Sequence, residues 1–231
     1  VSIRSVKKNF GEVPILHGVD IEIKDGSFTV LVGPSGCGKS TLLRMIAGLE
    51  EVSSGEIHIG SNKVNDLPPK ERDIAMVFQN YALYPHMTVG ENMAFSLTLA
   101  KRPQDEIDKK VARAADILAL GALLDRYPRQ LSGGQRQRVN IARALAFHPR
   151  LVILDEAVAA LDKSVQAQVL NLLQELKAER QLTYLFISHD LHVVHYISDE
   201  VMVMYLGQVV ERGPVERIYS AAAHPYTRAL L

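Results

Sequence analysis

The stretch that decides the fold is Gly33-Pro34-Ser35-Gly36-Cys37-Gly38-Lys39-Ser40. It follows the apolar run 28–32, which is typical of a buried strand, and precedes residues 39–48, whose apolar positions recur at helical spacing. Two glycines separated by four residues and followed by Lys-Ser are typical of a loop whose backbone N–H groups hold phosphates. We expect Lys39 to place its charge on those phosphates and the Ser40 hydroxyl to bind Mg²⁺. The alternative is a glycine-rich turn with an exposed lysine.

Strands and helices alternate outward from this loop, which predicts an α/β fold with a mostly parallel sheet and ligands at the carboxyl ends of its strands. A small antiparallel portion and a helical insertion over 89–148 complete the expectation. The chain then forms one domain, 1–231, with a core made of 1–88 and 149–231. The expected strands are 2–6, 19–23, 28–32, 56–59, 74–78, 151–154 and 183–187, with a hairpin over 201–211.

Composition excludes several classes of protein. Hydrophobic residues make up 47% and charged residues 23% of the 231 residues, a globular mixture. The 26 basic and 26 acidic residues balance, which argues against a general nucleic-acid binder. The sequence has no apolar run long enough to cross a bilayer and begins without a basic leader, so we expect any membrane part to belong to other subunits.

The single cysteine, Cys37, excludes an internal disulfide and makes a cysteine-based metal cluster improbable on composition. Because Cys37 lies in the phosphate loop at a helix start, a reactive thiol is one interpretation and a small loop residue is the other. No histidine is near it in the sequence, and a bound nucleotide would cover it. The second interpretation is therefore favoured.

Polar residues also follow other predicted strands. Asp155 and Glu156 end the apolar run 151–154, where Asp155 can orient Mg²⁺ or its waters and Glu156 can accept a proton from the water that attacks the γ-phosphate. His189 follows the strand 183–187, and Gln79 follows 74–78, where its amide can contact Mg²⁺ or water. The alternatives are acids that favour a helix start, and a structural histidine.

A second glycine pair stands at a helix start in Leu131-Ser132-Gly133-Gly134-Gln135. Ser132 is a natural N-cap, but two glycines there lower helix propensity. They are explained if backbone N–H groups approach a second anion, and a flexible N-cap turn is the alternative. A helix of about 15 residues, roughly 22 Å long, would separate this turn from the strand at Asp155, so the turn is expected to serve the nucleotide of another chain.

Taken together, these motifs resemble the nucleotide-binding subunits of ATP-binding cassette (ABC) transporters over essentially all 231 residues. The resemblance identifies Gly33 to Ser40 and Thr41 as the Walker A loop, Gln79 as the Q-loop and Leu131 to Gln135 as the signature. It also makes Asp155 the Walker B aspartate, Glu156 the catalytic glutamate and His189 the switch histidine. Phe10 matches the aromatic residue that stacks on adenine in this family, although an isolated aromatic is more often part of a core.

This resemblance implies a RecA-like P-loop ATPase core with ATP and Mg²⁺ as cofactors. Two subunits would close head to tail around two ATP molecules, each held between the Walker A loop of one chain and Ser132 to Gln135 of the other. Transmembrane permease subunits would dock near Gln79 and the helical insertion. The expected location is the cytoplasmic face of the cell membrane, with no span of its own and no nucleic-acid partner.

Two departures from the family pattern follow Glu156. Ala157 stands where the family has Pro, and Ala159 where it has Ser, which removes a hydroxyl that could bond across the dimer. We expect weaker coupling between the two ATP sites and intact binding.

The two halves also resemble different branches of the family. Residues 76–87 resemble sugar and glycerol-phosphate importers, and the sequence from about Leu151 resembles oligopeptide and dipeptide importers. Both branches usually continue beyond the last residue here. A natural hybrid, a reconstructed ancestor and a trimmed engineered chain each fit such a mixture.

Three other functions fit parts of the sequence. An ABC-class ATPase of DNA repair or chromosome maintenance would share the signature, but such proteins generally carry coiled coils, metal modules or a basic surface. A nucleotide-binding module with little turnover is favoured by Ala157 and Ala159 and opposed by Lys39 and Glu156. A small-molecule kinase leaves the signature unexplained.

Overall fold

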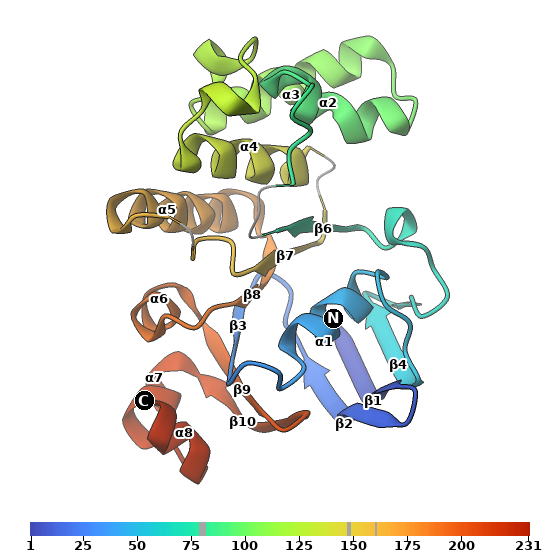
Figure 1. The fold of residues 1–231 in the computed structure, drawn as a ribbon, viewed down its shortest axis with the longest axis vertical. Helices are drawn as coiled ribbons and strands as arrows, with labels where there is room; N and C mark the ends of the chain where they lie inside the picture. Colours follow the sequence, from blue (N-terminus) through green and yellow to red (C-terminus); the bar gives the residue numbers. More distant parts are fainter. Residues whose placement is uncertain (79–81, 147–148, 160) are drawn as a thin grey trace.

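A six-stranded sheet forms the centre of the computed structural model, which describes residues 1–78, 82–146, 149–159 and 161–231 (Figure 1). The strand order is β10-β9-β3-β8-β7-β6, and every neighbouring pair is parallel except β10 with β9. The parallel strands therefore all end at one edge of the sheet. The bounds are β3 Phe28–Val32, β6 Ile74–Val77, β7 Leu151–Asp155, β8 Thr183–Ile187, β9 Glu200–Tyr205 and β10 Gln208–Pro214.

A second, antiparallel sheet has the order β2-β1-β4-β5. Helix α1 (Lys39–Ile46) lies between the two sheets: its Leu42 and Leu43 are fully buried in a cluster that includes Leu16 of β2 and Leu31 of β3. Burying one stripe of α1 against both sheets fixes the direction in which the helix leaves the glycine-rich loop. The strand bounds are β1 Ser2–Phe10, β2 Val13–Glu22, β4 Ser54–Ile59 and β5 Asn62–Lys63.

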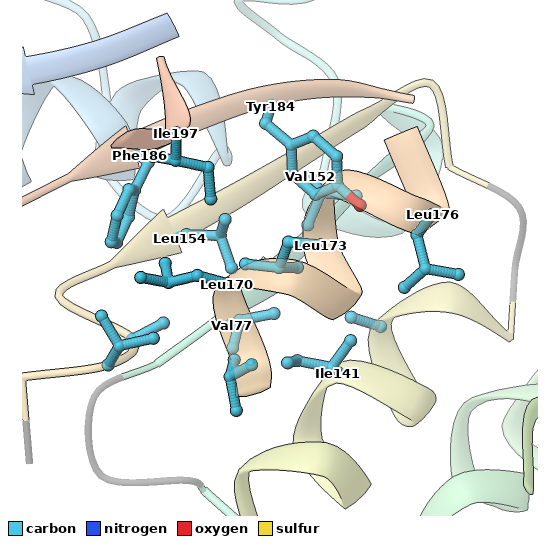
Figure 2. Packing of buried hydrophobic residues seen from close by; sticks show 14 of the residues in the cluster. Val77, Ile141, Val152, Leu154, Leu170, Leu173, Leu176, Tyr184, Phe186 and Ile197 are labelled. Carbon is cyan, nitrogen blue, oxygen red and sulfur yellow. The ribbon is translucent and has the colours of Figure 1, made fainter. Parts of the chain in front are cut away.

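Helix α5 (Lys163–Arg180) packs on the other face of the central sheet (Figure 2). Its Leu170 and Leu173 meet Leu154 of β7 and Phe186 of β8 in one buried cluster. Asp162 caps its first turn by accepting a hydrogen bond from the N–H of Val165 at 3.0 Å. The caps set where α5 begins, and its apolar face sets which side meets the sheet.

The three longer helices between β6 and β7 are α2 (Val89–Leu99), α3 (Gln104–Ile117) and α4 (Gly133–Leu145), drawn at the top of Figure 1. The described part of 89–148 contains no strand, as expected from the sequence. A capping box between Thr88 and Glu91 starts α2. The buried amide of Asn92 anchors the preceding turn, because it donates to three backbone carbonyls and accepts from the N–H of Tyr84.

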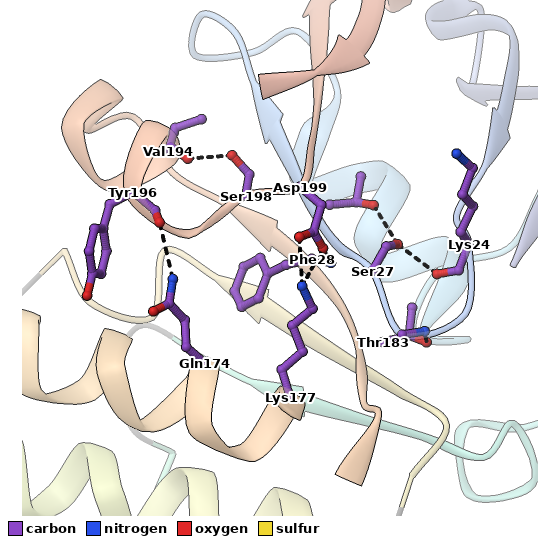
Figure 3. A network of polar contacts seen from close by, with 12 residues as sticks. Lys24, Ser27, Phe28, Gln174, Lys177, Thr183, Val194, Tyr196, Ser198 and Asp199 are labelled. Carbon is purple, nitrogen blue, oxygen red and sulfur yellow. Dashed lines mark hydrogen bonds and ion pairs between the residues drawn. The ribbon is translucent and has the colours of Figure 1, made fainter. Parts of the chain in front are cut away.

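Asp199 fastens α5 to the beginning of β3 and β9 (Figure 3). Its Oδ2 accepts the N–H of Phe28 at 2.6 Å, and its Oδ1 accepts from Nζ of Lys177 at 2.7 Å. This contact satisfies a backbone donor at the strand start. The remaining helices are α6 Leu191–Ile197, α7 Val215–Ala221 and α8 Pro225–Leu230.

Candidate functional site

The glycine-rich loop leaves β3 at the carboxyl edge of the central sheet and enters α1. Two of its glycines are required by close contacts. A Cβ at Gly33 would lie 2.1 Å from the carbonyl oxygen of Met204, and a Cβ at Gly38, where φ is +98°, would lie 2.6 Å from Leu16. Residues of both sheets therefore lie in close contact with the loop, and a side chain at Gly33 or Gly38 would displace the loop.

The Lys39 ammonium lies inside the loop. Its Nζ donates to the carbonyl oxygens of Gly33 at 2.8 Å and Pro34 at 2.9 Å. Ser35 and Gly36 at the tip are exposed, while Cys37 is only 4% exposed. The buried thiol opposes the reactive-cysteine interpretation and supports a packing role for Cys37.

Ser40 and Asp155 face each other across the carboxyl edge. The Ser40 hydroxyl donates to Oδ1 of Asp155 at 3.4 Å, which joins the first turn of α1 to the end of β7. Burial, and then the negative charge of Glu156, raise the pKa of the Asp155 carboxyl above its usual value. A hydroxyl and a carboxylate are oxygen ligands of the kind Mg²⁺ prefers, so this pair fits the ion that the family implies.

Glu156 and His189 form a second polar pair beside the first. Nδ1 of His189 lies 3.6 Å from Oε1 of Glu156, and the imidazole is the more exposed of the two, at 67%. Glu156 has a φ of +49°, an uncommon conformation for a residue with a side chain, and its N–H donates to the carbonyl of Ile187. This conformation turns the chain sharply after β7, and strain of this kind is often found at functional sites.

The signature turn caps α4. The Ser132 hydroxyl accepts the N–H of Gln135 at 3.3 Å, and the Gln135 side chain accepts the N–H of Ser132 at 3.0 Å. A Cβ at Gly134 would lie 2.2 Å from Cγ1 of Val165 on α5. The second glycine is therefore required by helix packing, a reason that the sequence did not reveal.

In Figure 1, α4 and the phosphate loop lie in different parts of the molecule, and β6, β7 and α5 lie between them. Phe10 ends β1 and is 48% exposed, with the Nζ of Lys8 4.8 Å from its ring centroid. Thr41 lies in the first turn of α1, and Gln79 lies outside the described residues.

A family model described as "ABC transporter" matches residues 16–159. The chain belongs to the ABC transporter family. Curated relatives of this cassette include the sn-glycerol-3-phosphate import ATP-binding proteins UgpC of Cereibacter sphaeroides, 50% identical over 231 residues, and of Bordetella avium, 51% identical over 234. Both alignments cover the whole of this chain, which spans 66% and 64% of the respective relatives.

Those relatives support the resemblance to glycerol-phosphate importers along the entire cassette. The resemblance of the C-terminal part to peptide importers stays a prediction.

The expected fold class, a P-loop ABC cassette with mixed sheets and helices, is confirmed by two solved structures. The dimeric bacterial cassette MJ0796 has a TM-score of 0.82 and 33% identity, covering 93% of this chain and 98% of its own. For the cassette MJ1267 the TM-score is 0.88 with 29% identity, covering 99% and 97%.

The described residues contain neither a membrane-spanning helix nor a cluster of metal-binding side chains. None of the helices is long and apolar enough to span a membrane. Within the same ranges, no group of three or more His, Cys, Asp or Glu side chains is arranged to hold a metal ion. The Ser40–Asp155 pair differs from such a cluster, because it consists of two residues and one of them offers a hydroxyl.

Proposed function

We propose that this chain binds and hydrolyses ATP and that its carboxyl-edge site drives solute import through membrane partner subunits. The observation that carries the proposal is the convergence of four groups from three separate segments of the chain. The hydroxyl of Ser40 lies 3.4 Å from Asp155, and Glu156, the next residue, lies 3.6 Å from His189. A phosphate loop, two carboxylates and an imidazole at one edge suit phosphoryl transfer to water.

Each side chain has a distinct role in this proposal. The loop N–H groups and Lys39 hold the β- and γ-phosphates, and Lys39 exchanges its contacts with the Gly33 and Pro34 carbonyls for phosphate oxygens. Ser40 and Asp155, joined by Gln79, hold Mg²⁺, which when bound neutralises charge on the phosphates. Glu156 accepts a proton from the attacking water, and His189 contacts the γ-phosphate. Phe10 stacks on the adenine.

Completion of each site requires a second copy of the chain. The signature turn of Ser132, Gly133, Gly134 and Gln135 is separated from the phosphate loop of its own chain by the central strands and α5. A head-to-tail dimer would place it opposite the loop of its partner, where the N-terminus of α4 favours an anion. The dimeric structure of the cassette MJ0796 supports the formation of a dimer.

The transport role follows the import ATP-binding relatives. We infer a chain at the cytoplasmic face of the membrane, held there by permease subunits that contact the helical subdomain 89–148. The core of 1–88 and 149–231 would carry the nucleotide. Closing the dimer on ATP would move the permeases, and hydrolysis would release them.

Replacement of the proposed base tests the chemistry. Glu156→Gln should lose at least a hundredfold in ATP turnover, since general-base catalysis contributes about 10²–10⁴. With ATP the variant should accumulate as a dimer in light scattering, because the nucleotide that favours closure is no longer consumed. The control is Glu175→Gln, which changes an exposed glutamate of α5. Parental turnover in Glu156→Gln would refute the role of Glu156.

A mixed dimer tests whether the site is shared between chains. Lys39→Ala on one copy and Ser132→Arg on the other leave one site with an intact loop and an intact signature turn, so the purified mixed dimer should regain up to half of the parental turnover. Both changes on one copy should inactivate both sites when it pairs with a parental chain. Activity in the second dimer and none in the first would show that each chain completes its own site.

A further inference from the structure

A cleft with a volume of about 390 Å³ opens at the amino ends of β7 and β8, at the opposite edge of the sheet from the phosphate loop. We call it the arginine cleft. Three arginines line it: Arg113 of α3, Arg180 of α5 and Arg150 just before β7, together with Thr183 and Leu145. The volume lies in the range of sites for small molecules.

The charge around the cleft is predominantly positive. Among the described residues that line it, Asp25 is the one acidic residue, against three arginines. Arg150 lies 3.7 Å from Asp73, so part of its charge is already compensated. Arg113 and Arg180 have no carboxylate within ion-pair distance among the residues of the described ranges. Two guanidinium groups from separate helices are thus available to one anion.

A buried hydroxyl adds a donor to the inner surface. Thr183 is 4% exposed, and its Oγ1 accepts the N–H of Gly26 at 3.0 Å. That bond uses one lone pair and leaves the hydroxyl proton available, because a hydroxyl both donates and accepts. The lining of the cleft therefore includes a hydroxyl as well as three arginines.

The favourable interaction of a cation with the C-terminal end of a helix does not explain why both Arg113 and Arg180 line the cleft. Arg180 is the last residue of α5, where a cation interacts favourably with the helix dipole. Arg113 lies outside the last turn of α3, so the same argument does not apply to it. A smaller adjoining cavity is lined by both arginines and by Lys110, whose charge is already compensated by Glu106 at 2.9 Å.

We propose that the arginine cleft binds the phosphate group of a small free phosphate or phosphate ester. Guanidinium groups present planar pairs of donors that match phosphate oxygens, so Arg113 and Arg180 suit a phosphate group. The ligand would join α3, in the proposed helical subdomain, to α5 and β8 of the core. The cleft is a recess and not a flat patch, which favours a free phosphate over a lipid surface.

Calorimetric titration tests the proposal with inorganic phosphate and methyl phosphate as probes. The phosphate loop is first filled with Mg²⁺ and a non-hydrolysable ATP analogue, so that the probes report on other sites. Both probes should bind saturably, and Arg113→Gln or Arg180→Gln should each weaken binding by about tenfold or more. The matched control, Arg217→Gln, removes an exposed arginine of α7 and should leave binding unchanged.

Chemical labelling gives an independent measurement. Phenylglyoxal modification followed by mass spectrometry should show protection of Arg113 and Arg180, but not of Arg217, by either probe. Both glutamine variants should keep the parental melting temperature and ATP turnover. Absence of saturable binding would overturn the proposal, as would equal binding by all variants. Binding only to hexaglutamate, or only to vesicles of anionic phospholipid, would also overturn it.

Discussion

The substitution Gly134→Ala tests whether the packing of α4 against α5 requires a glycine at the signature turn. The added Cβ would lie 2.2 Å from Cγ1 of Val165, where an ordinary carbon contact is about 3.5–4.0 Å. Val165 is β-branched, so it has few alternative rotamers and α4 and α5 must separate or Val165 must adopt a less favourable one.

Two opposing contributions set the size of the effect. Overpacking costs about 1–3 kcal/mol, and replacing glycine by alanine in a helix returns up to about 1 kcal/mol. We therefore expect a net loss of about 1–2 kcal/mol, which corresponds to a fall of about 2–8 °C in melting temperature for a chain of this size.

A double-mutant cycle provides the assay. Melting temperatures and urea midpoints are measured for Gly134→Ala, Val165→Ala and the pair, without nucleotide. Removing the two methyl groups of Val165 makes room for the new Cβ, so the pair should be more stable than the sum of the single changes predicts, by about 1 kcal/mol or more. Additive losses would refute the contact as the reason for this glycine. If the double variant regains stability but not ATP turnover, the glycine has a second role at the nucleotide.

Three further changes test individual contacts. Tyr184→Phe should stabilise the protein by about 1 kcal/mol, seen as a higher urea midpoint, because the buried hydroxyl has no hydrogen-bond partner within the described ranges. Asp199→Ala should cost about 1–3 kcal/mol in the same assay by leaving the Phe28 N–H unpaired; an unchanged midpoint would contradict this. Asp155→Asn should raise the melting temperature of nucleotide-free protein at neutral pH. Because the pKa of the Asp155 carboxyl is raised in the folded state, the folded protein binds this proton more tightly than the unfolded chain does. The protonated carboxyl therefore stabilises the fold at low pH, and this stabilisation is lost as pH rises through the raised pKa. The gain should therefore shrink as pH falls towards the ordinary Asp pKa of about 3.9, and a gain independent of pH would contradict the reasoning.

The strands at the centre of the sheet were predicted well from the sequence, because their continuous apolar runs correspond to strands that are buried on both faces. The strands 28–32 and 183–187 were predicted at their observed bounds, and each is buried on both faces. At the edges the agreement was poorer. Strand β1 runs to Phe10 although its expected alternation stopped near residue 6, because pairing with β2 extends it through register shifts. Helices α7 and α8 were not predicted; both lie after the last predicted element, the hairpin over 201–211.

The candidate site divides in the same way. Ser40, Asp155 and His189 were proposed from motifs at strand ends and at the glycine-rich loop, and the structure places them at one edge of the sheet. Their roles stay predictions. Contacts between elements distant in the sequence gave no signal. Neither the Met204 carbonyl against Gly33 nor Val165 against Gly134 could be anticipated, because both depend on how the sheets and helices pack.

Strand β7 connects two chemically different ends of the molecule. It begins next to Arg150 and ends at Asp155, four residue steps or about 13 Å further on. Two exposed charges that far apart would be largely screened, because the Debye length is about 8 Å at physiological ionic strength. Salt ions cannot enter the buried strand between these two ends, so a charge arriving at one end is screened from the other much less. The two ends can therefore be coupled through the protein interior as well as by a shift of the strand.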